Sequence, residues 1–333
     1  MTESQELVDV LDARVKRRDD RRAFFKAAAG AAALGAGFAF ATAAEAQTVT
    51  DVDVLNFALN LEYLEANFYY YAAFGTAIPT ASTSGTGTFG AATGGRAVTF
   101  TDPAVRSYAQ EIVADELNHV NFLRSALSTA AVAQPQIDVG IAPNGAFSSA
   151  ARAAGLIGPT STANPTFFDP YASDENFLLG SFIFEDVGVT AYKGASPLIS
   201  NPTYLTAAAG ILAVEAYHAG LVRTVLYRKG LGTPASGTTA AVAANPSLIS
   251  SAGAISAARD SLDGTTSLDQ GIATQQGNFG ATSNITPTDG NAIAFSRSTG
   301  QVLNIVYLNK AAVTAGGFFP AGVNGTIKTS AAN

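Results

Sequence analysis

The sequence has few of the residue types that many redox and nucleophilic sites require. Its 333 residues include no cysteine, no tryptophan and a single methionine, Met1. Without thiols the chain can form neither a disulfide nor a rubredoxin-like iron centre, because such a centre is held by cysteine sulfur. Any electrons for a redox reaction must therefore come from a donor outside the chain.

Charge and motifs exclude further classes of function. The chain has 19 Lys and Arg against 26 Asp and Glu, a formal net charge of −7. A chain with no basic excess is not expected to bind nucleic acid. It has only two histidines, no nucleophile elbow and no glycine loop that could cradle a phosphate. Serine-nucleophile and nucleotide-dependent chemistry therefore have no support.

The two histidines share one pattern. A glutamate stands three residues before each of them, in the pairs Glu116/His119 and Glu215/His218. Residues i and i+3 lie on one face of a helix, so each carboxylate and imidazole can point into the same cavity. Taken alone, one such pair is better explained by an ion pair on the surface. Both pairs lie in apolar stretches, however, where an unpartnered charge is costly, which indicates that they bind a cation.

The sequence around these pairs repeats in degenerate form. Upstream, Glu62 is followed seven residues later by Tyr69, and Glu185 is followed in the same way by Tyr192. Each half of the chain would then supply one glutamate from its first helix and one Glu-x-x-His pair from its second. Four carboxylates and two imidazoles form a ligand set for two metal ions.

These motifs resemble the ferritin-like superfamily of four-helix bundles with di-iron or di-manganese centres, over about residues 51–230. The segment 55–69 is similar to the branch that contains desiccation-related proteins and exported bacterial relatives. The resemblance implies an all-α fold, a ferritin-like four-helix bundle with a long crossover and an irregular C-terminal extension. It implies two iron ions, or alternatively manganese, held by Glu62 and Glu185 as terminal ligands, by Glu116 and Glu215 as bridging ligands, and by His119 and His218 with one metal each.

One carboxylate departs from this ligand pattern. Glu65 could replace Glu62 as a ligand, but in the repeat it corresponds to Gly188, whereas Glu62 corresponds to Glu185. The repeat therefore favours Glu62. Tyr69 and Tyr192 are expected to be core aromatics. The alternative is that their phenols hydrogen-bond a ligand or carry an electron.

Three charged residues lie close to the predicted ligands. Asp186 could orient a ligating imidazole, or it could be a solvated or capping residue. Arg124 and Arg223 occupy equivalent positions in the repeat. They could pair with carboxylates such as Glu65 or Asp186.

Residues 1–46 have the features of an export signal. Arg21 and Arg22 precede an uncharged run over 27–44, and a small-x-small site at 44–46 follows. This resembles a twin-arginine signal, with a Sec-type signal or a retained anchor as alternatives. The run is too weakly apolar for a membrane span. We expect the mature chain to lie in the periplasm or at the cell surface, with no further membrane span.

Periodicity and capping residues predict four long helices, over 51–74, 102–127, 173–193 and 202–228. The bundle is expected to span 47–230. The crossover 128–172 contains five prolines, so no regular helix is predicted there. The extension 231–333 is predicted to pack on the bundle with short helices over 246–262 and 299–308, although an interaction or oligomer surface is the alternative. Such large appendages argue against an iron-storage cage but permit a homo-oligomer.

The combined features predict an exported metalloprotein whose metal pair reacts with oxygen or peroxide in oxidative or desiccation stress defence. An external electron donor is its expected partner. Its activity would resemble that of a peroxidase, a catalase or a ferroxidase. The alternative is a stress-protective surface protein in which the bundle and its metal are structural. Replacing both histidines would distinguish the two.

Overall fold

The computed structural model describes residues 49–232 and 243–333, so the export signal predicted over 1–46 lies outside the described residues. Four long helices dominate this part of the chain and confirm the predicted all-α class. They are α2 (Asp51–Phe74), α3 (Pro103–Leu127), α5 (Asp174–Ala195) and α6 (Pro202–Leu231).

Local chemistry explains where these helices begin. The side chain of Thr50 accepts a hydrogen bond from the backbone of Asp53, whose carboxylate in turn accepts one from the backbone of Thr50. Asp102 and Asn201 cap α3 and α6, each directly before a proline that fits the first helical position. Because these signals are local, the sequence predicts the starts of all four helices to within one residue.

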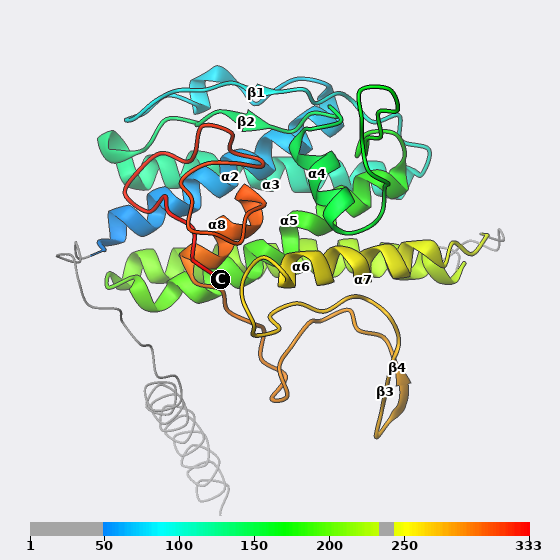
Figure 1. Cartoon of the computed structure of the whole chain (residues 1–333). Coiled ribbons are helices and arrows are strands. Elements are labelled where there is room, and N and C mark those ends of the chain that lie inside the picture. Colours follow the sequence, from blue (N-terminus) through cyan, green and yellow to red (C-terminus); the bar gives the residue numbers. More distant parts are fainter. Residues whose placement is uncertain (1–48, 233–242) are drawn as a thin grey trace, which may run out of the picture. The chain divides into compact units, whose positions relative to one another are not determined.

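The helices pack as two hairpins. Helix α2 packs along α3, and α5 packs along α6; the two pairs form the layers visible in Figure 1. Aromatic side chains fill the space between the layers around Phe68, whose ring lies 5.3 Å from that of Phe147 and 5.5 Å from that of Phe184. The core thus joins both hairpins and the crossover.

The crossover differs from the prediction because it contains an eight-residue helix, α4 (Ala146–Ala153). The interval between Pro143 and Pro159 is long enough for two turns, and the buried Phe147 anchors them. Two short strands, β1 (Ala92–Thr93) and β2 (Ile137–Asp138), also pair in parallel. The sequence did not predict this pairing, since it joins loops that are far apart along the chain.

The C-terminal region contains α7 (Ser247–Asp260), the hairpin of β3 (Gln275–Gly277) and β4 (Gly280–Thr282), and α8 (Thr299–Tyr307). Helix α7 contacts α5 and α6, and α8 contacts α5. The β3–β4 hairpin extends away from the helices (Figure 1). The two short helices lie close to their predicted ranges.

A buried ionic network ties this region to the bundle. Asp186 of α5 accepts hydrogen bonds from Arg223 of α6 at 2.8 Å and from Arg259 of α7 at 2.9 Å. The network continues through Asp269 to Arg297, with Arg297 Nη2 and Asp269 Oδ2 2.9 Å apart. Breaking such a buried pair would leave an uncompensated charge, so the network holds α7 and the following segment against α5 and α6.

Helix α6 is the one helix among the described residues that is long and apolar enough to cross a membrane, with a mean hydropathy of 1.4 in a window that is 33% buried. The expectation that the mature chain has no membrane span stays a prediction. In the structure α6 packs along α5 and carries buried Glu215 and Arg223, as the core helix of a bundle does.

Candidate metal centre

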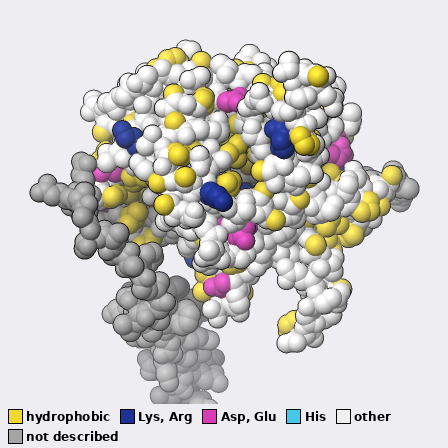
Figure 2. Space-filling model, in the orientation of Figure 1, with side chains coloured by type: hydrophobic (Ala, Val, Ile, Leu, Met, Phe, Trp, Pro, Cys, Tyr) yellow, Lys and Arg dark blue, Asp and Glu magenta, His cyan; other side chains and the backbone are white. Residues whose placement is uncertain are grey.

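The predicted ligands converge inside the bundle. Each long helix contributes at least one of them, and all six side chains are buried, with exposed fractions from 0% to 9%. No histidine is visible on the face of the molecule in Figure 2, where charged side chains are sparse. The converging residues are Glu62 from α2, Glu116 and His119 from α3, Glu185 from α5, and Glu215 and His218 from α6.

The first of two ligand groups surrounds His119. Its Nδ1 atom lies 3.2 Å from Glu62 Oε2, 3.5 Å from Glu116 Oε2 and 3.8 Å from Glu215 Oε1. One ligand atom from each of these four residues can be chosen so that all lie within 4.8 Å of one another. Three carboxylates and one imidazole could hold a single divalent cation.

The second group surrounds His218. Its Nδ1 atom lies 3.1 Å from Glu116 Oε1 and 3.5 Å from Glu185 Oε2. Glu116 thus belongs to both groups and presents one oxygen to each imidazole, as a bridging ligand would. Glu215, which the resemblance also assigned as a bridge, belongs only to the group around His119.

Most polar atoms of the six predicted ligands have no hydrogen-bond partner. Among the described residues, eleven buried side-chain nitrogen and oxygen atoms have none, and eight of them belong to the six predicted ligands. Buried polar atoms are normally paired, because an unpaired one costs its full desolvation energy. Metal ions would satisfy all eight, so the donor set fits the implied metal pair.

Electrostatics support the same interpretation. Burial and the charge of Glu116 raise the pKa of Glu62 to about 7, and burial raises that of Glu215 well above its usual range. Burial alone would lower the pKa of His119, but its contacts with Glu116 and Glu62 raise it to about 10. Without a cation the cluster therefore retains protons, and a metal would have to displace them.

Two tyrosines connect the hairpins to the cluster. The phenol of Tyr69 on α2 donates a hydrogen bond to Glu185 on α5, and that of Tyr192 on α5 donates one to Glu62 on α2. Both rings are also buried in the core. The hydrogen-bonding alternative thus describes their contacts better than a purely apolar role. Each phenol leaves the second oxygen of its glutamate facing the cluster.

The structure reveals one residue near His218 that the sequence analysis missed. Asp115 Oδ2 lies 3.2 Å from His218 Nε2, so its carboxylate can orient the imidazole. Asp186 does not have this role, because it pairs with Arg223 and Arg259. Asp115 directly precedes Glu116, but its partner belongs to another helix, and only the packing of α3 against α6 reveals the contact.

The remaining charged candidates have other partners. Glu65 is buried but belongs to neither ligand group. Arg223 pairs with Asp186, which was one of the predicted pairs. Arg124 instead donates hydrogen bonds to the phenol of Tyr63 and to Ser84, so its predicted pairing with a nearby carboxylate was wrong.

Gly188 has a role in the site that the sequence did not predict. A Cβ atom there would lie 2.1 Å from Glu215 Oε2. The carboxylate of Glu215 therefore occupies space that any other residue would fill. The repeat gives the only signal in the sequence, since it aligns Gly188 with Glu65.

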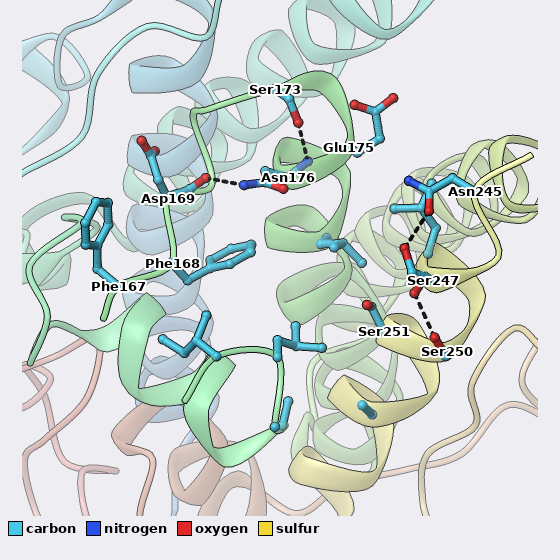
Figure 3. Close-up of a pocket in the computed structure, with 17 residues that line it drawn as sticks. Phe167, Phe168, Asp169, Ser173, Glu175, Asn176, Asn245, Ser247, Ser250 and Ser251 are labelled. Atoms are coloured by element: carbon cyan, nitrogen blue, oxygen red, sulfur yellow. Dashed lines mark hydrogen bonds between the residues drawn. The ribbon is translucent and has the colours of Figure 1, made fainter. Parts of the chain in front are cut away.

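A wide cleft of about 800 Å³ lies elsewhere, between the start of α5, the residues after α4 and the start of α7 (Figure 3). None of its lining residues is a predicted ligand. Several of its polar groups bond to one another: Asn176 donates to the backbone oxygen of Asp169, and the hydroxyl of Ser173 caps α5. None of the buried unpaired side-chain atoms found among the described residues belongs to the lining of the cleft.

Comparisons with known proteins agree with this geometry. A family model described as "Ferritin-like domain" matches residues 50–228. The chain is 32% identical over 184 residues to the desiccation-related protein PCC13-62 of Craterostigma plantagineum, a match that covers 54% of each chain. It is 26% identical over 286 residues to the ferritin-like catalase Nec2 of Nesocodon mauritianus, covering 83% of this chain and 84% of the relative. The chain thus matches about half the length of the first relative and most of the second.

Proposed function

This chain belongs to the ferritin-like domain family, and we propose that its buried cluster binds two iron or manganese ions and reacts with oxygen or peroxide. The convergence of eight unpartnered ligand atoms carries this proposal. The similarity to a protein named a ferritin-like catalase supports peroxide as the substrate. Catalase, peroxidase and ferroxidase reactions all use peroxide or oxygen as the oxidant. The last two also take electrons from a donor outside the chain.

The bound metals would supply a redox pair and a Lewis acid. The chain's own residues prepare the site for them. Glu116 offers one oxygen to each ligand group, so a single anion offsets charge in both halves. The hydrogen bonds from Tyr69 and Tyr192 fix two carboxylates, and Asp115 fixes the ring of His218. Such preorganisation holds ligands in one geometry while the surrounding apolar core excludes water.

The test begins with protein stripped of metal by a chelator and reloaded with Fe(II) or Mn(II). We expect two bound ions per chain, an optical change on adding peroxide, and consumption of peroxide or oxygen. The double variant His119→Ala/His218→Ala should lose both metals. Glu111→Gln changes an exposed position on the same helix as His119 and should lose neither metal. A fully loaded protein that consumes no peroxide and no oxygen and oxidises no Fe(II) would refute the enzymatic proposal.

A second candidate is a stress-protective protein in which metal is structural. The 32% identity to a protein named desiccation-related favours it. Drying a sensitive enzyme together with this protein distinguishes the two functions. Protection that survives in the His119→Ala/His218→Ala variant would make the metal chemistry incidental, and protection that disappears with the metal would link the two.

The location proposed for this activity is outside the inner membrane, since Arg21 and Arg22 precede an uncharged run and a small-x-small site. Asp20 stands where such signals usually have serine or threonine. Expression in a bacterium with a twin-arginine pathway tests the proposal. The wild-type chain should reach the periplasm, and Arg21→Lys/Arg22→Lys should remain in the cytoplasm. Equal export of both chains would contradict this route.

A further inference from the structure

A small apolar chamber adjoins the cluster between α2 and α5. Its volume is about 20 Å³. A water molecule needs roughly 10–15 Å³ on this measure, so the chamber has room for one small molecule. Residues of α2, α5 and α8 line it, together with one residue of the C-terminal segment: Leu61, Leu64, Glu65, Ile183, Phe184, Val187, Gly188, Tyr192, Ile305, Val306 and Phe318.

Two residues of the chamber wall, Gly188 and Tyr192, contact ligands of the cluster. The Oε2 atom of Glu215 lies 2.1 Å from where a Cβ of Gly188 would stand, so a ligand carboxylate lies against this part of the wall. Tyr192, which also lines the chamber, donates a hydrogen bond from its hydroxyl to Glu62. Glu215 and Glu62 thus lie directly behind the chamber wall, the first at a bare glycine and the second at a phenol.

Among the described residues, Glu65 supplies the only carboxylate on the chamber wall. Its side chain is buried, yet it belongs to neither ligand group. The other wall residues are aliphatic or aromatic, apart from Gly188. A molecule in the chamber could therefore hydrogen-bond at Glu65 while its remaining surface contacts apolar groups, an arrangement typical of small-ligand sites.

The region after the bundle closes the chamber. Ile305 and Val306 reach the wall from α8, and Phe318 reaches it from the following turn. The ring of Phe318 packs edge-on against Phe184 at 4.9 Å and against Phe147 at 5.1 Å. This wall is consequently fixed by the aromatic core, and its position sets the size of the chamber.

We propose that this chamber admits oxygen or hydrogen peroxide to the metal pair, that Glu65 positions the molecule, and that Ile305, Val306 and Phe318 exclude larger peroxides. This inference rests on the proposed function and specifies its substrate class. The C-terminal region thereby acts as a size filter built onto the bundle. This filtering role would account for the packing of α8 against α5.

The first experiment measures access without turnover. Stopped-flow absorbance follows the binding of nitric oxide, a molecule of the size of oxygen, to the Fe(II)-loaded protein. Val306→Phe should fill the chamber and slow binding at least tenfold with metal content unchanged. Val302→Phe is the matched control, because Val302 is equally buried on α8 but does not line the chamber. Wild-type binding rates in a fully loaded, folded Val306→Phe protein would overturn the proposal.

The second experiment enlarges the chamber. We expect Ile305→Ala/Val306→Ala to raise kcat/KM for tert-butyl hydroperoxide relative to hydrogen peroxide at least tenfold, and Val302→Ala/Leu303→Ala to leave the ratio unchanged. An unchanged ratio in Ile305→Ala/Val306→Ala would overturn the size filter. This test does not depend on whether Val306→Phe folds. Loss of nitric oxide access in Val306→Phe without peroxide consumption by any protein would refute the proposed function but support the chamber as the gas route.

Discussion

Raising the pH should destabilise the metal-free protein. Burial and the charge of Glu116 raise the pKa of Glu62 from 4.5 to about 7. The folded state thus holds this proton more tightly than the unfolded state does. The resulting stability is fully present below pH 4.5 and is lost as the pH rises through about 7. His119 acts in the same direction, because its pKa is raised to about 10, so its contribution is complete below pH 6.5 and declines as the pH rises through about 10.

The size of the effect follows from Glu62 alone. A pKa rise from 4.5 to about 7 in a fully buried group corresponds to roughly 3 kcal/mol of stability lost between these values. For a domain of this size, this lowers the Tm by about 6 °C. Glu116 does not oppose the trend in this window. Although burial would raise its pKa, contacts with both histidines lower it to about 2, so its contribution changes only below pH 4.5.

Calorimetric melting of the chelator-treated protein at pH 5, 6, 7 and 8 measures the loss. Glu62→Gln removes the titrating group and should flatten the dependence by most of the calculated amount. Added Fe(II) or Mn(II) should reverse it, because metal binds the deprotonated ligands and stabilises the folded state by mass action. A metal-free protein whose stability is constant or rises from pH 5 to 8 would refute the reasoning, as would an identical slope in Glu62→Gln.

Four further variants test separate parts of the structure. Glu116→Gln should reduce the bound metal from two ions to at most one, because its carboxylate is shared by both ligand groups. Glu111→Gln should keep both ions, and elemental analysis measures the metal content of each variant. Asp115→Asn should weaken metal binding by about ten- to a hundredfold in calorimetric titration, since it orients His218. Tyr192→Phe leaves a buried carboxylate oxygen unpaired and should cost about 1–3 kcal/mol in denaturant unfolding. Arg259→Ala breaks the buried network, should cost about 3–5 kcal/mol and should expose α7 to limited proteolysis. Normal metal content in the first, normal affinity in the second or wild-type stability in the last two would contradict the corresponding role.

The sequence predicted the features that depend on local spacing. The i, i+3 relation between Glu116 and His119 places both on one helix face, and caps such as Thr50 and Asn201 mark where helices begin. The internal repeat then identified Glu62 and Glu185 as the matching pair from the first helices. These relations require no knowledge of which helices are neighbours.

Features that depend on packing between distant segments were missed. Asp115 contacts a histidine 103 residues away, and the partners of Arg259 include a carboxylate 73 residues away. Neither contact leaves a periodic signal in the sequence. The space that Gly188 provides for Glu215 also exists only once α5 and α6 are packed together. The short helix α4 was missed because the prolines of the crossover break a long helix but leave room for two turns between Pro143 and Pro159.

The most direct test of the metal centre is a crystal structure of the Fe(II)- or Mn(II)-loaded protein, with anomalous diffraction recorded at the absorption edge of the metal. We predict two anomalous peaks inside the bundle, one beside His119 and one beside His218, with the carboxylate of Glu116 between them. A folded protein with no peak among these side chains, or with metal bound only elsewhere, would contradict the account.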